Sequence, residues 1–573
     1  MTMHVVATAG HVDHGKSSLV LALTGTDPDR FEEEKRRGLT IDLGFAHVAL
    51  PSGAGISFID VPGHVKFLKN MLAGIGAVDA CLFVVAATEG WKPQSEEHLR
   101  ILELVGVKRG VIALTKTDLV DDDELELARL LLADQVKGTF LEDAPVIATA
   151  ATLGRGLDEL RGALDELVSE TPTAKDRGRA RLWVDRVFAA KGSGTVVTGT
   201  LAGGEVAVGD QVVVGPRQLP ARVRAIQSLG ASHQRIGPGN RVALNLNGVE
   251  HQDIVRGDAV TSPARWHVTA SFDARLQVLA AVDHQVSRRG AYVAYIGSGE
   301  FPIRMRVLGS EGIDPGAAGL VRLRTTTPLP LLPGDRFVLR ESGRSETVGG
   351  GEILDVAPVR AANKARPDRS VDRVIDERGW IDADELELLT GERRAATIGR
   401  WIAAPGKLEA LLVDVRTRVE AAGSLGLDVA SLDERERDAL AQADGLELVA
   451  GRVRIAAVVD PLANHLFVGS LASSLFTPPG AEGVDRAELR ALVQRGLVIE
   501  QDGVWFHPDV IGAATTVAKQ LLRDHPEGFT VAQFRDAVGA TRKHALPLVA
   551  LLDKRGITRR REDFRVAGPR LEG

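Results

Sequence analysis

The chain has 573 residues and a formal net charge of −7, and 44% of its residues are hydrophobic and 26% charged. At about 150 residues per domain this length predicts about four domains, and the negative charge argues against a protein that coats nucleic acid uniformly. The single cysteine, Cys81, excludes an internal disulfide framework and a cysteine metal cluster, and with no signal peptide and no apolar run of about 18 residues we expect a cytoplasmic protein without membrane association.

A glycine-bounded loop at residues 10–17 follows the first apolar run, residues 5–8, and precedes a helical pattern at 18–23. Its sequence, GHVDHGKS, has the spacing of a phosphate-binding P-loop. In such a loop, backbone N–H groups and a helix N-terminus point at a polyphosphate, the lysine neutralises the β and γ phosphates, and the serine hydroxyl ligates Mg²⁺. The nucleotide-binding residues that we expect here are Asp13, His14, Gly15, Lys16, Ser17 and Ser18.

Four further apolar runs, at residues 56–59, 81–86, 111–114 and 146–147, alternate with helical patterns. This alternation predicts an α/β domain with a parallel sheet and helices on both faces. Ligands of such sheets bind at the carboxyl ends of the strands, so polar residues directly after the runs are candidates for nucleotide contacts. These candidates are Asp60, Gly63, Thr115, Lys116, Asp118, Thr149, Ala150 and Ala151.

Asp118 is the residue that predicts which base the bound nucleotide carries. Its carboxylate can accept two hydrogen bonds from N1–H and the exocyclic NH₂ of guanine, a pair of donors that adenine lacks, so it predicts GTP rather than ATP. Asp60 can hold Mg²⁺ through water, and the Gly63 N–H can reach a γ-phosphate. Residues 149–151 occupy the position where GTPases contact guanine O6 through the backbone.

In this order the motifs resemble those of the translational GTPases, most closely at residues 10–17 and at DVPGH, residues 60–64. The resemblance implies that residues 35–41 form the first switch, with Thr40 as a further Mg²⁺ ligand beside Ser17 and Asp60. It also implies that His64 is the catalytic residue that orients the attacking water. Thr115 departs from the family, in which most members have asparagine. Because that residue braces the loop, we expect guanine selectivity to survive.

From residue 175 to residue 360 short alternating strands and frequent glycines predict two small antiparallel β-barrels. Residues 191–199 resemble the second domain of elongation factor Tu and its relatives, and residues 333–344 resemble the third. We therefore expect a GTPase domain at 1–172 and barrels at 175–264 and 265–360. The resemblance implies that the barrels bind the aminoacylated end and acceptor arm of a tRNA.

The switch segment, residues 29–45, looks most like that of the selenocysteine-specific elongation factors, in which the switch threonine is followed by IDLGF or a close variant. That resemblance implies an aminoacyl pocket formed by Asp185, Arg186 and Arg241. A selenol is anionic at neutral pH whereas serine is not, so two arginines would favour selenocysteine electrostatically. The alternative is that these residues are surface ion pairs on half-exposed strands.

After residue 365 the chain becomes helical, and a helix, a glycine and a hairpin recur at 440–455, 492–506 and 552–566. Each repeat looks like the end of a winged-helix unit, so we expect an all-α and winged-helix arm at 365–573, with its last unit at about 512–573. Residues 541–561 contain seven basic residues and one acid, the electrostatic pattern of a phosphate-binding surface. The predicted RNA-binding residues are Arg542, Lys543, Arg559, Arg560 and Arg561.

These features predict a monomeric GTPase that uses GTP/GDP and Mg²⁺, and the resemblance implies that it delivers selenocysteinyl-tRNA to the ribosome at UGA codons. The resemblance implies that its arm binds an mRNA hairpin, the selenocysteine insertion element. Two alternatives remain open from the sequence. One is another tRNA-delivery or initiation GTPase, and the other is a winged-helix nucleic-acid-binding regulator switched by GTP.

Overall fold

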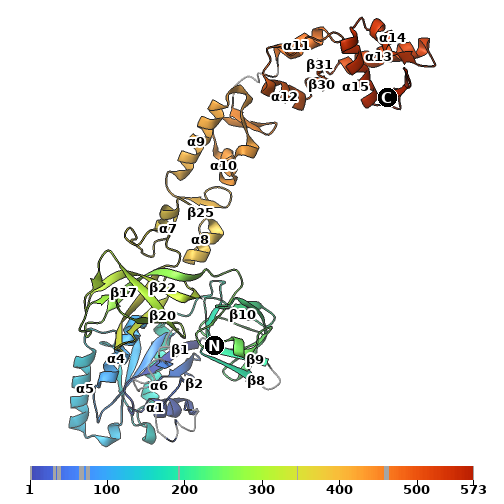
Figure 1. Cartoon of the computed structure of the whole chain (residues 1–573). Helices are drawn as coiled ribbons and strands as arrows, with labels where there is room; N and C mark the ends of the chain where they lie inside the picture. Colours follow the sequence, from blue (N-terminus) through green and yellow to red (C-terminus); the bar gives the residue numbers. More distant parts are fainter. Residues whose placement is uncertain are drawn as a thin grey trace. The chain divides into compact units, whose positions relative to one another are not determined.

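The computed structural model describes residues 3–29, 34, 36, 40–62, 70–71, 78–190, 194–344, 346–456, 462 and 464–571. They form two compact units, Met1–Ala404 and Pro405–Gly573, which are coloured from blue to yellow and from orange to red in Figure 1. Among these described residues, no helix has both the length and the apolar character needed to cross a membrane.

A six-stranded sheet in the order β2-β3-β1-β4-β5-β6 begins the first unit. All neighbours are parallel except β2, which runs antiparallel to β3. The five predicted apolar runs correspond to β1 and β3 to β6, whereas the edge strand β2 was not predicted. The strands are β1 (Met3–Ala9), β2 (Gly44–Ala49), β3 (Gly55–Asp60), β4 (Ala80–Ala86), β5 (Gly110–Thr115) and β6 (Val146–Ala148).

Helices cover both faces of this sheet, as the sequence predicts. Leu19 of α1 and Leu160 of α6 belong to the buried cluster on one face, and Leu102 of α4 and Leu132 of α5 belong to a cluster on the other. A sheet buried on both sides explains why its strands are continuous apolar runs. The helices are α1 (Lys16–Thr24), α4 (Pro93–Val105), α5 (Asp122–Val136) and α6 (Leu157–Glu170), with 3₁₀ turns η3 (Thr117–Leu119) and η4 (Ala151–Leu153).

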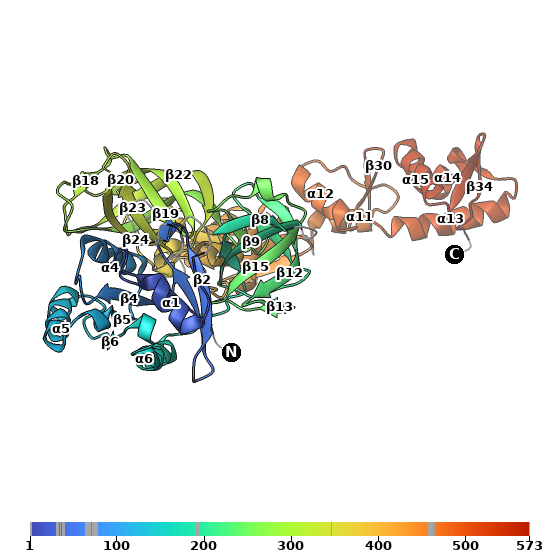
Figure 2. The same cartoon turned by 90° about the horizontal axis from the view of Figure 1, so that it is seen from below.

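The first barrel follows (Figure 2, strands β8, β9, β12 and β15). Its strands pair in the order β11-β16-β7-β9-β15-β12, and β12 pairs with β11 to close the ring. In β15 every second side chain is buried, which is the period of a barrel wall. The strands are β7 (Arg181–Trp183), β8 (Arg186–Ala190), β9 (Gly194–Ala202), β10 (Val206–Ala207), β11 (Gln211–Val214), β12 (Leu219–Ser228), β13 (Ala231–His233), β14 (Arg235–Ile236), β15 (Arg241–Asn247) and β16 (Ala259–Thr261).

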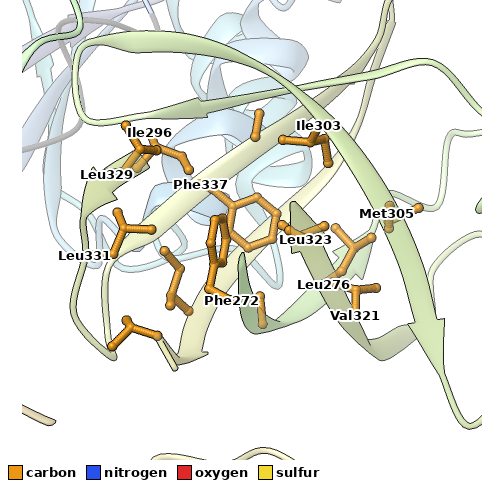
Figure 3. Packing of buried hydrophobic residues seen from close by; sticks show 14 of the residues in the cluster. Phe272, Leu276, Ile296, Ile303, Met305, Val321, Leu323, Leu329, Leu331 and Phe337 are labelled. Carbon is orange, nitrogen blue, oxygen red and sulfur yellow. The ribbon is translucent and has the colours of Figure 1, made fainter. Parts of the chain in front are cut away.

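The second barrel closes in the order β17-β22-β20-β19-β23-β24. Figure 3 shows the rings of Phe272 and Phe337 together in its interior, with Leu276 and Leu323 beside them, and both rings are fully buried. The strands are β17 (Val268–Val278), β18 (Val286–Ser287), β19 (Tyr292–Ile296), β20 (Gly299–Leu308), β21 (Gly312–Ile313), β22 (Ala318–Pro330), β23 (Arg336–Glu341) and β24 (Glu346–Asp355).

A small subdomain follows the second barrel and shares its hydrophobic cluster through Val371, Val374 and Leu386. It contains α7 (Val371–Arg378), β25 (Trp380–Asp382), α8 (Ala383–Thr390) and β26 (Trp401–Ala403). Residues 371–404, which the sequence analysis groups with the arm, thus pack with the first compact unit, and the second unit begins at Pro405.

The described residues of the second unit form three helix-and-hairpin repeats and three hydrophobic clusters, and Val504 and Phe506 of the second hairpin belong to the cluster of the third repeat. The hairpins β28/β29, β30/β31 and β33/β34 coincide with the three repeats found in the sequence. The elements are α9 (Lys407–Ala421), β27 (Leu427–Asp428), α10 (Glu434–Ala439), β28 (Leu446–Val449), β29 (Arg452–Ile455), α11 (Leu466–Ser473), α12 (Arg486–Gln494), β30 (Ile499–Gln501), β31 (Val504–Phe506), α13 (Val510–Asp524), β32 (Phe529–Thr530), α14 (Val531–Ala537), α15 (Arg542–Lys554), β33 (Thr558–Arg561) and β34 (Phe564–Ala567).

Candidate functional site

The P-loop connects β1 to α1 and passes close to β4. Gly10 has a φ of 132°, and a Cβ there would lie 2.1 Å from the carbonyl oxygen of Val84, so only glycine fits. Gly15, with a φ of 88°, precedes the first residue of α1. The predicted loop residues therefore surround the N-terminus of a helix, the arrangement that binds phosphate.

Lys16 lies across this loop. Its Nζ donates hydrogen bonds to the carbonyl oxygens of Gly10, at 3.1 Å, and His11, at 2.7 Å. Burial lowers the pKa of Lys16 to about 8, although Asp60 and Asp13 oppose the shift. A bound phosphate would give this buried ammonium the anionic partner that favours its charged form.

The three predicted Mg²⁺ ligands lie together. The Ser17 hydroxyl donates to Asp60 Oδ2 at 2.7 Å and lies 2.8 Å from Thr40 Oγ1. The other oxygen of Asp60 accepts a hydrogen bond from Thr8 Oγ1 at 2.6 Å, and burial raises the pKa of this carboxyl. Two hydroxyls and a carboxylate are oxygen donors of the kind that Mg²⁺ takes, so these residues fit that ion.

Asp29 is a neighbour of this group that the sequence analysis did not select. Its Oδ1 accepts a hydrogen bond from the Thr40 hydroxyl at 2.8 Å, and burial raises the pKa of its carboxyl to about 6. It lies at the start of the switch motif, but no spacing rule distinguishes it from other acidic residues of that segment. Asp29 places a second carboxylate beside the predicted metal ligands.

The predicted base-binding residues follow β5 and β6, at the same edge of the sheet. The Thr115 hydroxyl donates to the His14 carbonyl oxygen at 2.7 Å, which joins the loop after β5 to the P-loop. The Thr117 hydroxyl donates to the Thr149 carbonyl oxygen at 3.1 Å, which joins the loops after β5 and β6. Asp118 is exposed, as a carboxylate that reads a base must be before the base binds.

The remaining predicted contacts occupy the same two loops. Lys116 has a φ of 57° and its Nζ lies 3.0 Å from Glu89 Oε1. Ala150 is buried, and Ala151 is the first residue of η4. The predicted catalytic residue, His64, and Gly63 beside it lie outside the described residues, so their roles stay predictions.

Two side chains of α4 accept hydrogen bonds from backbone N–H groups of the P-loop. His98 Nδ1 accepts a hydrogen bond from the Gly10 N–H at 3.1 Å, and Gln94 Oε1 accepts one from the Val12 N–H at 3.2 Å. Burial lowers the pKa of His98 to about 3, so the ring is neutral and can accept. The sequence analysis missed both residues, because no motif links this part of α4 to the P-loop.

The three predicted residues of the aminoacyl pocket lie at the edge of the first barrel that faces β2. Arg241 makes two hydrogen bonds to the carboxylate of Asp185, one of them to Oδ1 at 3.0 Å, and the Thr198 hydroxyl donates to the same Oδ1 at 2.6 Å. Burial by itself would raise the pKa of the Asp185 carboxyl. The charge of Arg241 and the hydrogen bonds from Arg241 and Thr198 outweigh this effect, so the pKa lies below its ordinary value. Side-chain exposures of 12% for Arg241 and 8% for Asp185 distinguish this pair from a surface ion pair.

A hollow of about 250 Å³ lies beside this ion pair, between the barrel and β2. The barrel contributes Thr198, Gln227 and Arg241 to its lining, and the GTPase domain contributes Phe45 and His47. Both oxygens of Asp185 accept hydrogen bonds within the protein, so an amino group that bound to this carboxylate would compete with Arg241 and Thr198.

Arg256 makes a separate contact between the first barrel and the GTPase domain. Its guanidinium lies 3.3 Å from Asp42 Oδ1 and 3.2 Å from Asn70 Oδ1. Asp42 follows the predicted switch threonine by two residues, and Asn70 donates in turn to the Ile41 carbonyl oxygen at 2.8 Å. The barrel thereby contacts the segment that contains Thr40.

In the last repeat of the second unit, Arg542 of α15 and Arg560 of β33 line one hollow of about 440 Å³. Arg535 of α14 lines the same hollow and was not predicted, because it precedes the basic segment. Lys543, Arg559 and Arg561 are exposed. Two of the five predicted RNA-binding residues thus lie at the start of α15 and three on the adjacent strand β33, and Asp563 lines the same hollow as Arg542 and Arg560.

Family models match three parts of the chain. The elongation factor Tu GTP-binding domain matches residues 1–170, the β-barrel domain of selenocysteine-specific elongation factor matches 265–360, and the winged helix of elongation factor SelB matches 520–567.

Curated relatives of this chain carry the name selenocysteine-specific elongation factor. The Escherichia coli protein is 31% identical over 97% of this chain and 97% of its own length. The Desulfomicrobium baculatum protein is 39% identical, but the match spans 61% of this chain and 55% of that protein. A crystal structure of a bacterial selenocysteine-specific elongation factor, EF-Sec, resembles this one with a TM-score of 0.74 and 27% identity, covering 99% of this chain and all of the other.

Proposed function

Because the chain belongs to the family of selenocysteine-specific elongation factors and is a translational GTPase, we propose that it carries selenocysteinyl-tRNA to ribosomes paused at UGA codons. The tRNA binds to the GTP form and is released after GTP is hydrolysed to GDP and phosphate. The factor works as a cytoplasmic monomer. The observation that carries the proposal is the buried Arg241–Asp185 pair beside a hollow of about 250 Å³ at the border of the GTPase domain.

This pair supports selenocysteine as the bound amino acid. The Arg241 guanidinium borders the hollow and is paired with Asp185, and the neighbouring Arg186 gives the three side chains a net charge of +1, which favours an anion in this poorly solvated place. A selenol has a lower pKa than a thiol and is ionised at neutral pH, whereas the hydroxyl of serine stays neutral. The site therefore distinguishes the two amino acids by charge rather than by size.

The second unit determines at which codon of the mRNA the tRNA is delivered. Its last repeat presents Arg542 and Arg560 to one hollow, and an RNA phosphate backbone has the complementary charge. The partner is an mRNA hairpin near the UGA codon, and binding to it raises the local concentration of the factor at that codon.

The chemistry of GTP hydrolysis is distributed over residues of the GTPase domain. Lys16 would bind the phosphates, and Ser17, Thr40 and Asp60, which lie within hydrogen-bond distance of one another, would hold Mg²⁺. That ion would supply positive charge to stabilise the transferred phosphoryl group. His64 orients the attacking water. We expect His64→Ala to abolish ribosome-stimulated hydrolysis and to leave GTP affinity unchanged, and an unchanged stimulated rate would exclude His64 from the mechanism.

A purified translation system tests the proposal directly. Ribosomes carry an mRNA with a UGA codon, with or without the downstream hairpin, and receive selenocysteinyl-tRNA, GTP and the factor. We expect selenocysteine incorporation only when factor, GTP and hairpin are all present. Incorporation without the factor, or none with every component, contradicts the proposal, and equal incorporation without the hairpin contradicts the tethering.

A further inference from the structure

We propose that a hollow where the GTPase domain and the two barrels meet binds a small phosphate-bearing anion, at a site separate from the nucleotide. The hollow has a volume of about 420 Å³, which is within the range of small-molecule sites. The GTPase domain contributes Val78 and Asp79 to its lining, the first barrel contributes Thr200, and the second contributes Trp266 and Pro333.

The lining of this hollow is strongly basic. Four of its basic residues alternate along the segment that joins α6 to β7, so every second side chain from 175 to 181 reaches the same hollow. None of the four belongs to the predicted nucleotide or aminoacyl site. The lining contains five basic side chains, Lys175, Arg177, Arg179, Arg181 and Arg369, and two acidic ones, Asp79 and Asp335.

Both acidic side chains already have partners within the protein. The carboxylate of Asp335 accepts two hydrogen bonds from the guanidinium of Arg181, each at 2.7 Å. Asp79 Oδ2 accepts a hydrogen bond from the Val5 N–H at 2.8 Å, and burial raises the pKa of this carboxyl. These two carboxylates therefore do not balance the charge of the remaining basic residues.

Arg179 is the buried cation of the group. Its guanidinium donates hydrogen bonds to three backbone carbonyl oxygens, those of Arg265, Glu387 and Leu388. Within the described part of the chain it makes no ion pair with a carboxylate. Burial lowers the pKa of Arg179, Glu387 opposes this shift, and the charges of three nearby arginines add to it. A bound anion would stabilise such a cation.

The indole ring of Trp266 holds two guanidinium groups near each other. The Cζ atom of Arg179 lies 5.1 Å from the ring centroid, and that of Arg181 lies 4.5 Å from it. The ring Nε1 donates a hydrogen bond to the Ala180 carbonyl oxygen at 3.1 Å, which fixes the ring beside the start of β7. Positive charge is therefore positioned at the hollow before a ligand arrives, which lowers the cost of binding.

Lys175 and Arg177 are the exposed cations of the lining. Among the residues that the structure describes, neither side chain makes an ion pair or a hydrogen bond. Both can therefore turn toward a ligand, and phosphate oxygens accept charged hydrogen bonds from ammonium and guanidinium groups.

The hollow lies at the opposite edge of the six-stranded sheet from the P-loop. Asp79 directly precedes β4, whereas the P-loop follows the end of β1, and these two strands are parallel. A ligand in the hollow would therefore not compete with GTP. Because the GTPase domain and both barrels line the hollow, the ligand would stabilise the arrangement in which they meet.

Titration of the full-length protein with pyrophosphate tests the site while saturating GDP and Mg²⁺ occupy the P-loop. Calorimetry measures the affinity, and tryptophan fluorescence reports the place, because Trp266→Phe removes the ring beside the hollow. Lys175→Ala combined with Arg177→Ala removes the two exposed cations. The control combines Arg129→Ala with Lys137→Ala, an exposed pair of the same kinds on and directly after α5 of the GTPase domain.

We expect pyrophosphate to change the fluorescence saturably and to raise the temperature at which the GDP-bound domain unfolds. The Lys175→Ala/Arg177→Ala protein should bind pyrophosphate about tenfold more weakly, since it loses charged hydrogen bonds to the ligand. The control should stay within about twofold of the unmutated protein, because distant surface charges are screened. Tighter binding of ADP than of pyrophosphate would identify a nucleotide as the ligand, and the reverse order a free phosphate; both support the site.

Three results would each overturn the inference: no saturable signal in the unmutated protein, equal affinities in the two double variants, or an unchanged fluorescence signal in Trp266→Phe. Displacement of pyrophosphate by deacylated tRNA would also overturn it, since the hollow would then bind an RNA backbone. The proposed function is unaffected by these outcomes, because selenocysteine incorporation is measured separately.

Discussion

The hydroxyl of Thr115 donates a hydrogen bond to the backbone carbonyl oxygen of His14, 2.7 Å away. Thr115 ends β5 and leads into the predicted base-recognition loop, while His14 belongs to the P-loop, and both residues are buried. This one bond therefore joins the part of the site that reads the base to the part that binds the phosphates.

We expect Thr115→Ala to weaken the binding of GTP and GDP by about fivefold each, because a buried hydrogen bond contributes about 1 kcal/mol. The preference for guanine over adenine should remain, since Asp118 reads the base. Titrations with fluorescent GTP, GDP and ADP measure both quantities. Thr139→Ala, which removes a hydroxyl bonded to Val136 at the end of α5, is the control. A lost guanine preference would contradict the bracing role of Thr115.

Arg256 should couple the first barrel to the switch segment through Asp42 and Asn70. We expect Arg256→Ala to leave GTP and GDP affinities within about twofold but to lower aminoacyl-tRNA affinity in the GTP form by about tenfold, since a half-buried charged hydrogen bond contributes about 1.5 kcal/mol. Arg217→Ala, at an exposed arginine of the same barrel, should have no effect. Equal effects of the two substitutions on tRNA binding would exclude a specific coupling role.

Burial of His98 should make the GTPase domain sensitive to mild acid. Burial lowers the pKa of His98 to about 3 and that of His14 to about 4, whereas a histidine in the unfolded chain titrates near 6.5. Below about pH 6.5 the unfolded chain therefore binds protons that the folded chain does not, so stability is complete above this pH and decreases as the pH falls.

His98→Asn provides the test, because asparagine can still accept the Gly10 N–H but does not titrate. We expect the loss of unfolding free energy between about pH 6 and pH 5 to be smaller in this variant by up to about 1.4 kcal/mol per pH unit. Calorimetry of the unfolding transition that GDP shifts to higher temperature measures the difference. Identical pH slopes in the two proteins would show that His98 is not a buried neutral base.

The basic surface of the last repeat should bind RNA through phosphate contacts. We expect Arg542→Ala and Arg560→Ala each to weaken hairpin binding and to reduce the dependence of log Kd on log salt by about one unit, because each removes about one phosphate contact. Arg435→Ala, in the first repeat of the same unit, is the control. An unchanged salt dependence in both variants would show that the RNA does not bind to this surface of the last repeat.

The parts of this protein that the sequence predicted are those set by local patterns. The P-loop, the five apolar runs and the three hairpin repeats each depend on the periodicity or spacing of nearby residues. Strand β2 was not predicted because it is a partly exposed edge strand, and its sequence, GFAHVA, has no continuous apolar run like those of the buried strands. Phe45 of this strand pairs with Ile59 of β3, and its ring contacts Arg241 of the first barrel.

The unpredicted parts of the candidate site come from contacts between distant segments. His98 meets Gly10 and Arg256 meets Asn70 only after the sheet and the barrel have formed, and no motif connects these residues in the sequence. Arg241 was selected through a family resemblance, but its bidentate contact with Asp185 depends on the closure of the barrel. His64, the predicted catalytic residue, stays a prediction for kinetics to test.

The central claim is that the GTP-bound protein selects selenocysteine, and one measurement tests it most directly. Filter binding compares selenocysteinyl-tRNA with seryl-tRNA on the same tRNA body, using the full-length protein with a non-hydrolysable GTP analogue. We predict that the selenocysteinyl form binds about 100-fold more tightly and that Arg241→Ala reduces this preference, because a site built for an anion rejects a neutral analogue. Equal dissociation constants for the two tRNAs in the unmutated protein would contradict the account.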